Sequence, residues 1–186
     1  MDKERRRYFR IEDQVAMSVQ PLADGNIDAR LKDFWENQHA FSIRNNYNFQ
    51  IEQHIADFNK IENRMPELAR YLSVLEKQID RITGSLIDDG FDQSLAEKRA
   101  SLSAQGLAWH DRLAVSADTL VELNLKLLPS GFRLVIIARV VKVDSDSDHV
   151  DGSRISLDFE HIHEADREIL IKHIHAKQME SLSIAQ

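Results

Sequence analysis

The spacing of apolar residues changes twice along the chain. Between Gln14 and Gln20 apolar and polar residues alternate, which is typical of a strand with one buried face. From about Ile27 to Lys98 the spacing is helical, and after Arg99 segments rich in Val, Ile and Leu return. The pattern predicts an α+β protein in which a long helical insertion interrupts one small antiparallel β-domain. The expected divisions are 1–26 (leader and first strand), 27–98 (insertion) and 99–186 (remaining strands and a last helix).

The second β-rich part is expected to end in a helix. Segments around Leu102 and Leu107, then 120–128, 132–143 and 155–159, are separated by Pro, Gly, Ser and Asp residues that favour turns. From Glu164 to Met179 the pattern is helical, with acidic residues in the first turn. The buried stripe of this helix is predicted at Ala165, Ile169, Leu170 and Ile174.

The helical insertion has the most regular pattern in the chain. Apolar residues follow one another in alternating steps of three and four over three heptads, with a and d positions filled throughout. Pro66 is tolerated only in the first turn of a helix, so one helix is expected to end near Asn63 and a second to begin at Pro66. Asp88-Asp89-Gly90 provides a stop signal. The a and d residues are Met65, Leu68, Leu72, Leu75, Ile79, Ile82 and Leu86.

This stripe predicts association between chains. The alternative is a helical hairpin that closes within one chain. Only one of the six e and g positions is charged, and a neutral flank suits a bundle of three or four helices better than a two-stranded coil. We expect a homo-oligomer, in particular a tetramer. The e and g residues are Ala69, Tyr71, Glu76, Gln78, Thr83 and Ser85.

Charge is distributed unevenly along this acidic chain. The net charge is -7, yet Arg5, Arg6, Arg7 and Arg10 stand together at the N-terminus. The chain has no cysteine, which excludes disulfides, thiolate metal sites and cysteine nucleophiles. No apolar run is long enough to span a bilayer or to act as a secretory signal. We expect a cytoplasmic protein without a membrane span.

Two short motifs flank the predicted strands. Arg5-Arg6-x-x-x-Arg10 precedes the first strand, and Ser101-x-Ser103-x-x-Gly106 lies where one strand turns into the next. With the strands and the last helix, these motifs resemble a PilZ domain over residues 3–22 and 99–180. The resemblance implies a six-stranded β-barrel, binding of the bacterial second messenger cyclic di-GMP, and no cofactor. It also points to a family subset that forms tetramers through long inserted helices.

The chemistry of the motif residues agrees with this resemblance. Arginine offers five donors in a planar fork, which pairs with phosphate or with guanine O6 and N7. Ser103 would add a hydroxyl, and Gly106 would allow a tight turn and a close approach to the ligand. The family motif usually starts with Asp or Asn, which accepts from the guanine edge, whereas this chain has Ser101. Losing a charge-assisted hydrogen bond of about 1.5–3 kcal/mol would weaken binding.

The sequence also admits other interpretations of function. The arginines could form a solvated tail without a role, or the domain could be an adaptor that binds an unidentified downstream protein and no nucleotide. A basic arm could also bind nucleic acid, but the negative net charge disfavours it. No arrangement of catalytic residues stands out, so we expect no enzyme.

Metal binding is not expected either. Residues i and i+2 of a helix point in different directions, so His173 and His175 cannot chelate together, and with His161 and His163 they are expected to be surface histidines. The acidic run 144–148 lacks the Gly and Glu of a calcium loop. Phe34, Trp35 and Phe41 have helical spacing and are expected to be packing residues.

Overall fold

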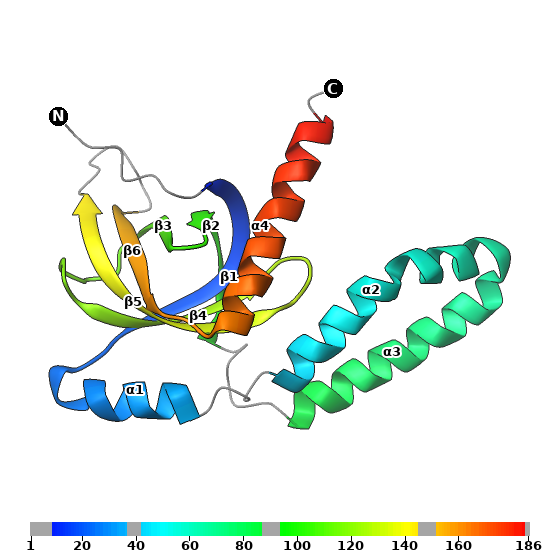
Figure 1. Ribbon diagram of the computed structural model, residues 1–186, viewed down its shortest axis with the longest axis horizontal. Helices are drawn as coiled ribbons and strands as arrows, with labels where there is room; N and C mark the ends of the chain where they lie inside the picture. The colour runs from blue at the N-terminus through cyan, green and yellow to red at the C-terminus, as the bar shows by residue number, and fades with distance from the viewer. Residues whose placement is uncertain (1–8, 37–41, 87–93, 145–151, 185–186) are drawn as a thin grey trace.

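The computed structural model describes residues 9–36, 42–86, 94–144 and 152–184. Six antiparallel strands close into a barrel in the order β1-β2-β3-β6-β5-β4 (Figure 1). A helical hairpin projects from one side of this barrel, and a last helix lies along it. The α+β architecture predicted from the sequence is confirmed. The strands are β1 (Ile11–Pro21), β2 (Ala96–Ser103), β3 (Gly106–Asp111), β4 (Leu120–Leu127), β5 (Arg133–Asp144) and β6 (Ser153–His161).

Alternating side chains fill the barrel interior. Along β4, Val121, Leu123, Leu125 and Leu127 are fully buried, and Trp109 of β3 is 2% exposed. These residues face one another because successive side chains of a strand point to opposite faces of the sheet. Closure of the sheet also leaves no unpaired edge. The barrel therefore has a complete core of its own.

The described residues between β1 and β2 form three helices besides a short 3-10 turn (η1, Asp24–Asn26). α1 (Ile27–Glu36) lies across one end of the barrel (Figure 1). Phe34 of α1 is buried, and its ring stacks on that of His163 with centroids 4.2 Å apart. Trp35 contacts the same histidine edge-on, so both aromatic residues are packing residues as predicted. α1 thus belongs to the barrel unit, and Phe41 lies outside the described residues.

α2 (Ser42–Arg64) and α3 (Pro66–Leu86) form an antiparallel hairpin that breaks at the predicted proline. Asn45, near the start of α2, joins this hairpin to the barrel. Its side chain donates to the carbonyl of Arg133 (2.9 Å) and accepts from the amide of the same residue (3.0 Å). β2 begins at Ala96, three residues inside the range expected for the insertion, because residues 96–98 pair with β1.

The hairpin covers only one side of α3. The least exposed positions in its first half are Ala69, Leu72, Ser73 and Glu76, and their spacing places them on one face of the helix, toward α2. Leu72 is the one heptad residue among these four, and the other described heptad residues lie on a neighbouring face. Of the heptad residues, Met65, Leu68, Leu75, Ile79 and Ile82 are 39–58% exposed in the single chain.

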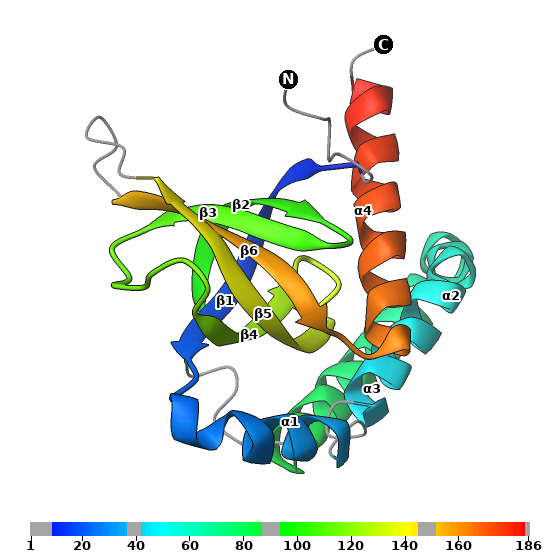
Figure 2. The same cartoon turned by 60° about the vertical axis from the view of Figure 1, so that its left-hand side comes forward.

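α4 (Glu164–Ile184) starts where predicted and runs past the barrel (Figure 2). Leu170 and Ile174 are buried in the barrel core cluster, with Ile169 partly buried against it, as expected. The prediction for Ala165 is wrong, since this residue is exposed. Asp166, one position further along, faces inward instead, because the buried side of the helix is turned toward the positions 166, 170 and 173.

The histidines also differ from expectation. His163 is 6% exposed, and the side chain of His173 is 7% exposed, so neither is a surface residue. Both pack where a helix meets the barrel, which the helical period alone does not reveal.

Candidate functional site

Three neighbouring strands, β2, β3 and β6, present small side chains on the outer face of the barrel. Ser101 of β2 pairs with Glu12 of β1 on one side and with Ala108 of β3 on the other, and Ala108 pairs with Ser156 of β6. Their sequence neighbours, such as Leu102, face the core, so these residues face outward. Side chains this small leave room for a ligand to lie close to the backbone.

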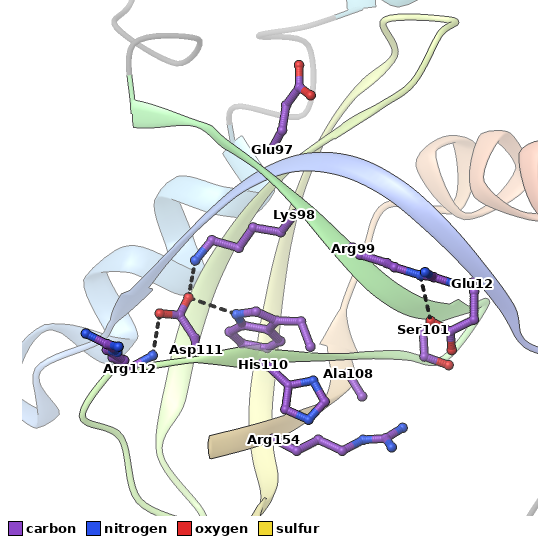
Figure 3. Close-up of a pocket in the computed structure, with 11 residues that line it drawn as sticks. Glu12, Glu97, Lys98, Arg99, Ser101, Ala108, His110, Asp111, Arg112 and Arg154 are labelled. Atoms are coloured by element: carbon purple, nitrogen blue, oxygen red, sulfur yellow. Dashed lines mark hydrogen bonds and ion pairs between the residues drawn. The ribbon is translucent and has the colours of Figure 1, made fainter. Parts of the chain in front are cut away.

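A groove with a volume of about 740 Å³ opens over this face (Figure 3). This volume is within the range of small-molecule sites, about 300–1,000 Å³. Most of its lining is polar or charged. The lining residues are Glu12, Glu97, Lys98, Arg99, Ser101, Ala108, Trp109, His110, Asp111, Arg112 and Arg154.

One end of the groove is held together by Asp111. Its carboxylate accepts from Lys98, from the indole N–H of Trp109 (3.0 Å) and from the backbone amide of Arg112 (2.7 Å). Burial raises the pKa of Asp111, but the hydrogen bonds from Lys98 and Trp109 outweigh it and lower the pKa overall. This carboxylate is therefore ionised and committed to fixing the groove wall.

The rest of the groove carries cationic and acidic side chains that project outward. Arg154 of β6 pairs with His110 of β3, and Arg99 of β2 lines the same groove. The Arg99 guanidinium lies 3.9 Å from the carboxylate of Glu12 (Figure 3). Guanidinium groups beside a floor of small residues are suited to an anionic or nucleobase ligand.

α4 is fixed to the two segments that border this groove. The Asp13 carboxylate, on β1, accepts from His173 Nε2 (2.6 Å) and lies 3.4 Å from Lys177 Nζ. Arg167 donates to the carbonyl of Ala104 (3.2 Å), in the turn between β2 and β3. The helix thus supports the groove from behind.

Comparison with known proteins identifies the barrel. A PilZ domain family model matches residues 86–176. This part of the chain, from the end of α3 into α4, is a PilZ domain. The match to the PilZ family indicates a receptor or adaptor domain and indicates no catalytic family. Members of the PilZ family include cyclic di-GMP receptors.

Two solved structures resemble the whole chain. One is a tetrameric PilZ protein of Xanthomonas campestris, described as self-assembled through an unusual helical bundle. It has a TM-score of 0.59 and 16% identity, with 96% of this chain and 92% of that chain covered. The other is the Bacillus subtilis inhibitor of motility MotI/DgrA, with a TM-score of 0.49 and 11% identity. The match covers 96% of this chain but only 53% of MotI, so the chain spans about half of that protein's length. No curated protein matches the sequence.

The described end of the first motif lies just before β1. Arg5 and Arg6 lie outside the described residues, and Arg10 is exposed just before β1. The first residue of β1, Ile11, pairs with Leu102, which is inside the second motif. Arg10, the described end of the first motif, is therefore adjacent in the sheet to the second motif, although 90 residues separate Arg10 from Ser101 in the sequence.

The second motif forms the β2–β3 turn. The Ser103 hydroxyl accepts from the backbone amide of Gly106 (3.1 Å) and donates to the carbonyl of that residue (3.1 Å). A Cβ at Gly106 would lie 2.3 Å from the carbonyl oxygen of Leu157, so close contact with β6 requires glycine there. Ser101 is 9% exposed between its longer neighbours. Both Ser103 and Gly106 thus have structural roles that the motif alone did not show.

The structure also adds residues that the motifs did not include. Glu12, Arg99, His110 and Arg154 enter the groove because the strand register aligns them across β1, β2, β3 and β6. No local sequence signal marks them.

The described residues also bear on metal binding and membrane spanning. Within the described residues, no cluster of three or more His, Asp or Glu side chains could hold a metal ion. In the same part of the chain, no helix is both long and apolar enough to cross a membrane. The acidic run 145–148 lies outside the described residues.

Proposed function

We propose that this PilZ protein is a receptor that binds cyclic di-GMP in the groove over β1, β2, β3 and β6. The observation that carries the proposal is the strand register: it pairs Ile11, the residue after Arg10, with Leu102, and it pairs Glu12 with Ser101 at a polar groove. Arg5, Arg6 and Arg10 would close over the nucleotide, and Ser101, Ser103 and Gly106 would lie beneath it. A ligand with two phosphates and two guanines matches this supply of guanidinium donors.

The same proposal includes assembly through the helical hairpin. The exposed stripe of α3 is wider than the a and d positions, because Tyr71 and Val74 are 63% and 54% exposed beside it. A contiguous apolar surface of this kind on a soluble fold marks an interaction site. The resemblance to the tetrameric Xanthomonas PilZ protein supports a tetramer formed by packing these stripes together.

Signalling would follow from ordering of the N-terminal arginine segment when the ligand binds. Ligand capture would fix Arg5, Arg6 and Arg10 against the barrel and so change the surface offered to a downstream protein. Several barrels on one helical bundle would present this surface in several copies, which raises avidity for a multivalent target.

One observation favours a second candidate, an adaptor that binds protein partners without nucleotide. The Ser103 hydroxyl is already used within its own turn, and Ser101 supplies no charged acceptor. A site with these two features would bind the nucleotide more weakly than one with a carboxylate at position 101.

Calorimetry with cyclic di-GMP separates the two candidates. The receptor proposal expects saturable binding to the wild type and a loss of about 10- to 100-fold in Arg6→Ala, the effect of removing one charge-assisted contact. Arg64→Ala is the matched control, since Arg64 is exposed at the end of α2. Absence of binding in the wild type would favour the adaptor, whereas equal affinities of all three proteins would contradict the role of Arg6.

Light scattering tests the assembly. We expect a tetramer for the wild type and a smaller species for Ile79→Asp, which places a charge in the apolar stripe. Lys77→Asp changes charge on the same helix, outside the stripe, and should leave the mass unchanged. A monomeric wild type at micromolar concentration would refute the assembly.

A further inference from the structure

Guanine sets a specific demand on the groove. Its Watson–Crick edge presents two adjacent donors, N1–H and N2–H, and the two oxygens of a carboxylate can accept both at once. A single hydroxyl such as that of Ser101 cannot. If the groove binds guanine selectively, a carboxylate near Ser101 is needed, and the groove contains three: Glu12, Glu97 and Asp111.

Two of these carboxylates are poorly placed for the task. Asp111 accepts from Lys98, Trp109 and a backbone amide at the far end of the groove. Glu97 pairs with Ala16, well along β2 from Ser101, and accepts from Gln14 Nε2 (2.9 Å). Neither group is next to the motif.

Glu12 lies where the carboxylate is needed. It is the direct cross-strand partner of Ser101, and side chains in such pairs have Cβ atoms about 4.5–5.5 Å apart on the same face. Its side chain is 56% exposed and lines the groove (Figure 3). The nearest Arg99 nitrogen is 3.9 Å away, longer than a hydrogen bond, so this ion pair leaves the carboxylate oxygens accessible.

We propose that Glu12 is the guanine-selecting residue of this chain, supplying from β1 the carboxylate that position 101 lacks. This inference rests on the proposed function. Arg99 completes the arrangement: while Glu12 accepts from N1–H and N2–H, the neighbouring guanidinium can donate to O6 and N7 of a guanine. Adenine has no N1–H or N2–H donors, so the same pair disfavours it.

The first experiment compares two carboxylate-to-amide variants of the same groove by calorimetry with cyclic di-GMP. Glu12→Gln is expected to weaken binding about 10- to 100-fold, because it removes a charged acceptor. Glu97→Gln removes the same charge from the same groove and is expected to change affinity less than threefold. Equal losses in both variants would overturn the assignment, and so would equal gains, which are the result expected if each carboxylate acts only by repelling the anionic ligand.

The second experiment is a rescue. Ser101→Asp in the Glu12→Gln background returns a carboxylate to the same pair of positions, and it should restore most of the lost affinity. In the wild-type background the same substitution places two carboxylates side by side and should give no gain. An equal effect of Ser101→Asp in both backgrounds would refute the proposal.

Selectivity provides a readout that a structural role would not change. The preference for cyclic di-GMP over cyclic di-AMP should fall in Glu12→Gln and return in the double variant. If the wild type binds cyclic di-GMP and this preference is unchanged in Glu12→Gln, the role of Glu12 is wrong while the receptor function stands. If the wild type binds no cyclic di-GMP, the proposed function fails first, and the assignment of Glu12 fails with it.

Discussion

The barrel buries its apolar residues, whereas the α2–α3 hairpin leaves many of its apolar residues exposed to solvent. In the barrel, Leu123, Leu125 and Leu127 are fully removed from solvent. In the hairpin, Leu75 and Ile79 remain 42% and 46% exposed, although their spacing is the most regular in the chain. A closed sheet has a single interior that its own strands fill. Two helices have one shared seam, and α3 carries a second apolar face that α2 does not cover.

This difference separates stability from assembly. The free energy of folding of the barrel is expected to come from within one chain, whereas the apolar face of the hairpin contributes only when another surface covers it. The groove lies on the barrel and the association stripe lies on α3, so the two functions can be tested separately.

A matched pair of leucines gives the largest effect. Leu125→Ala should lower the free energy of unfolding by about 2–5 kcal/mol at every protein concentration, because it leaves a cavity in the barrel core. Leu75→Ala should have a cost that grows with protein concentration, because its side chain is buried only on association. Urea denaturation at two concentrations separates these behaviours. Equal, concentration-independent costs would contradict the comparison.

Asp166 should make the barrel unit sensitive to pH. Burial raises the pKa of this carboxyl to about 7 from 3.8, so the folded state favours the protonated form. Its contribution to stability is complete below about pH 4 and is lost as the pH rises through about 7. At about 1.4 kcal/mol per pKa unit, the loss is at most about 4 kcal/mol. Asp166→Asn should therefore stabilise the protein at pH 8 and not at pH 4, measured by thermal unfolding at both values.

Asp13 should show the opposite dependence. Burial raises its pKa, but the hydrogen bond from His173 and the charges of His173 and Lys177 outweigh this and lower it below 3.8. The stability that this carboxylate contributes is present above about pH 4 and lost as the pH falls through its lowered pKa. Asp13→Asn should cost about 1.5–3 kcal/mol at pH 7, the range for hydrogen bonds to charged groups. A variant as stable as the wild type at pH 7 would show that α4 is not fixed through this pair.

The smallest effect is expected for the same substitution in the hairpin. Asp57 lies 2.8 Å from Lys60 on α2, and hydrogen bonding to that lysine lowers its pKa, but both side chains are largely exposed. Solvent screens exposed pairs of this kind. Asp57→Asn should leave the unfolding midpoint unchanged within error, in contrast to Asp13→Asn. A clear loss would mean that association buries this side of α2.

The elements themselves were largely predictable. Alternation and turn residues indicated the strands, and Pro66 marked the break between two helices, because these signals act over a few residues of backbone. The limits of β2 and the buried side of α4 were less accurate. Ala165 was placed in the core and is exposed, since a helical period gives the spacing of a buried stripe but not its rotation toward a neighbour.

The site was predictable only in part. Of the second motif's residues, Ser101 lines the groove, whereas Ser103 and Gly106 interact within the β2–β3 turn. The position of Glu12 beside Ser101 depends on the register between β1 and β2, whose paired residues are nearly 90 positions apart. The same holds for the burial of His163 and His173, which arises where helices pack on the barrel.

The sequence by itself determined the strand and helix segments, the apolar stripe of α3 and the two motifs, because each depends on local backbone preferences and on the period of hydrophobic residues. The folded chain was needed to show which carboxylates and guanidinium groups share a groove. It was also needed to show which face of α3 stays exposed. Those outcomes depend on barrel closure and strand register, and cooperative packing between distant segments sets both.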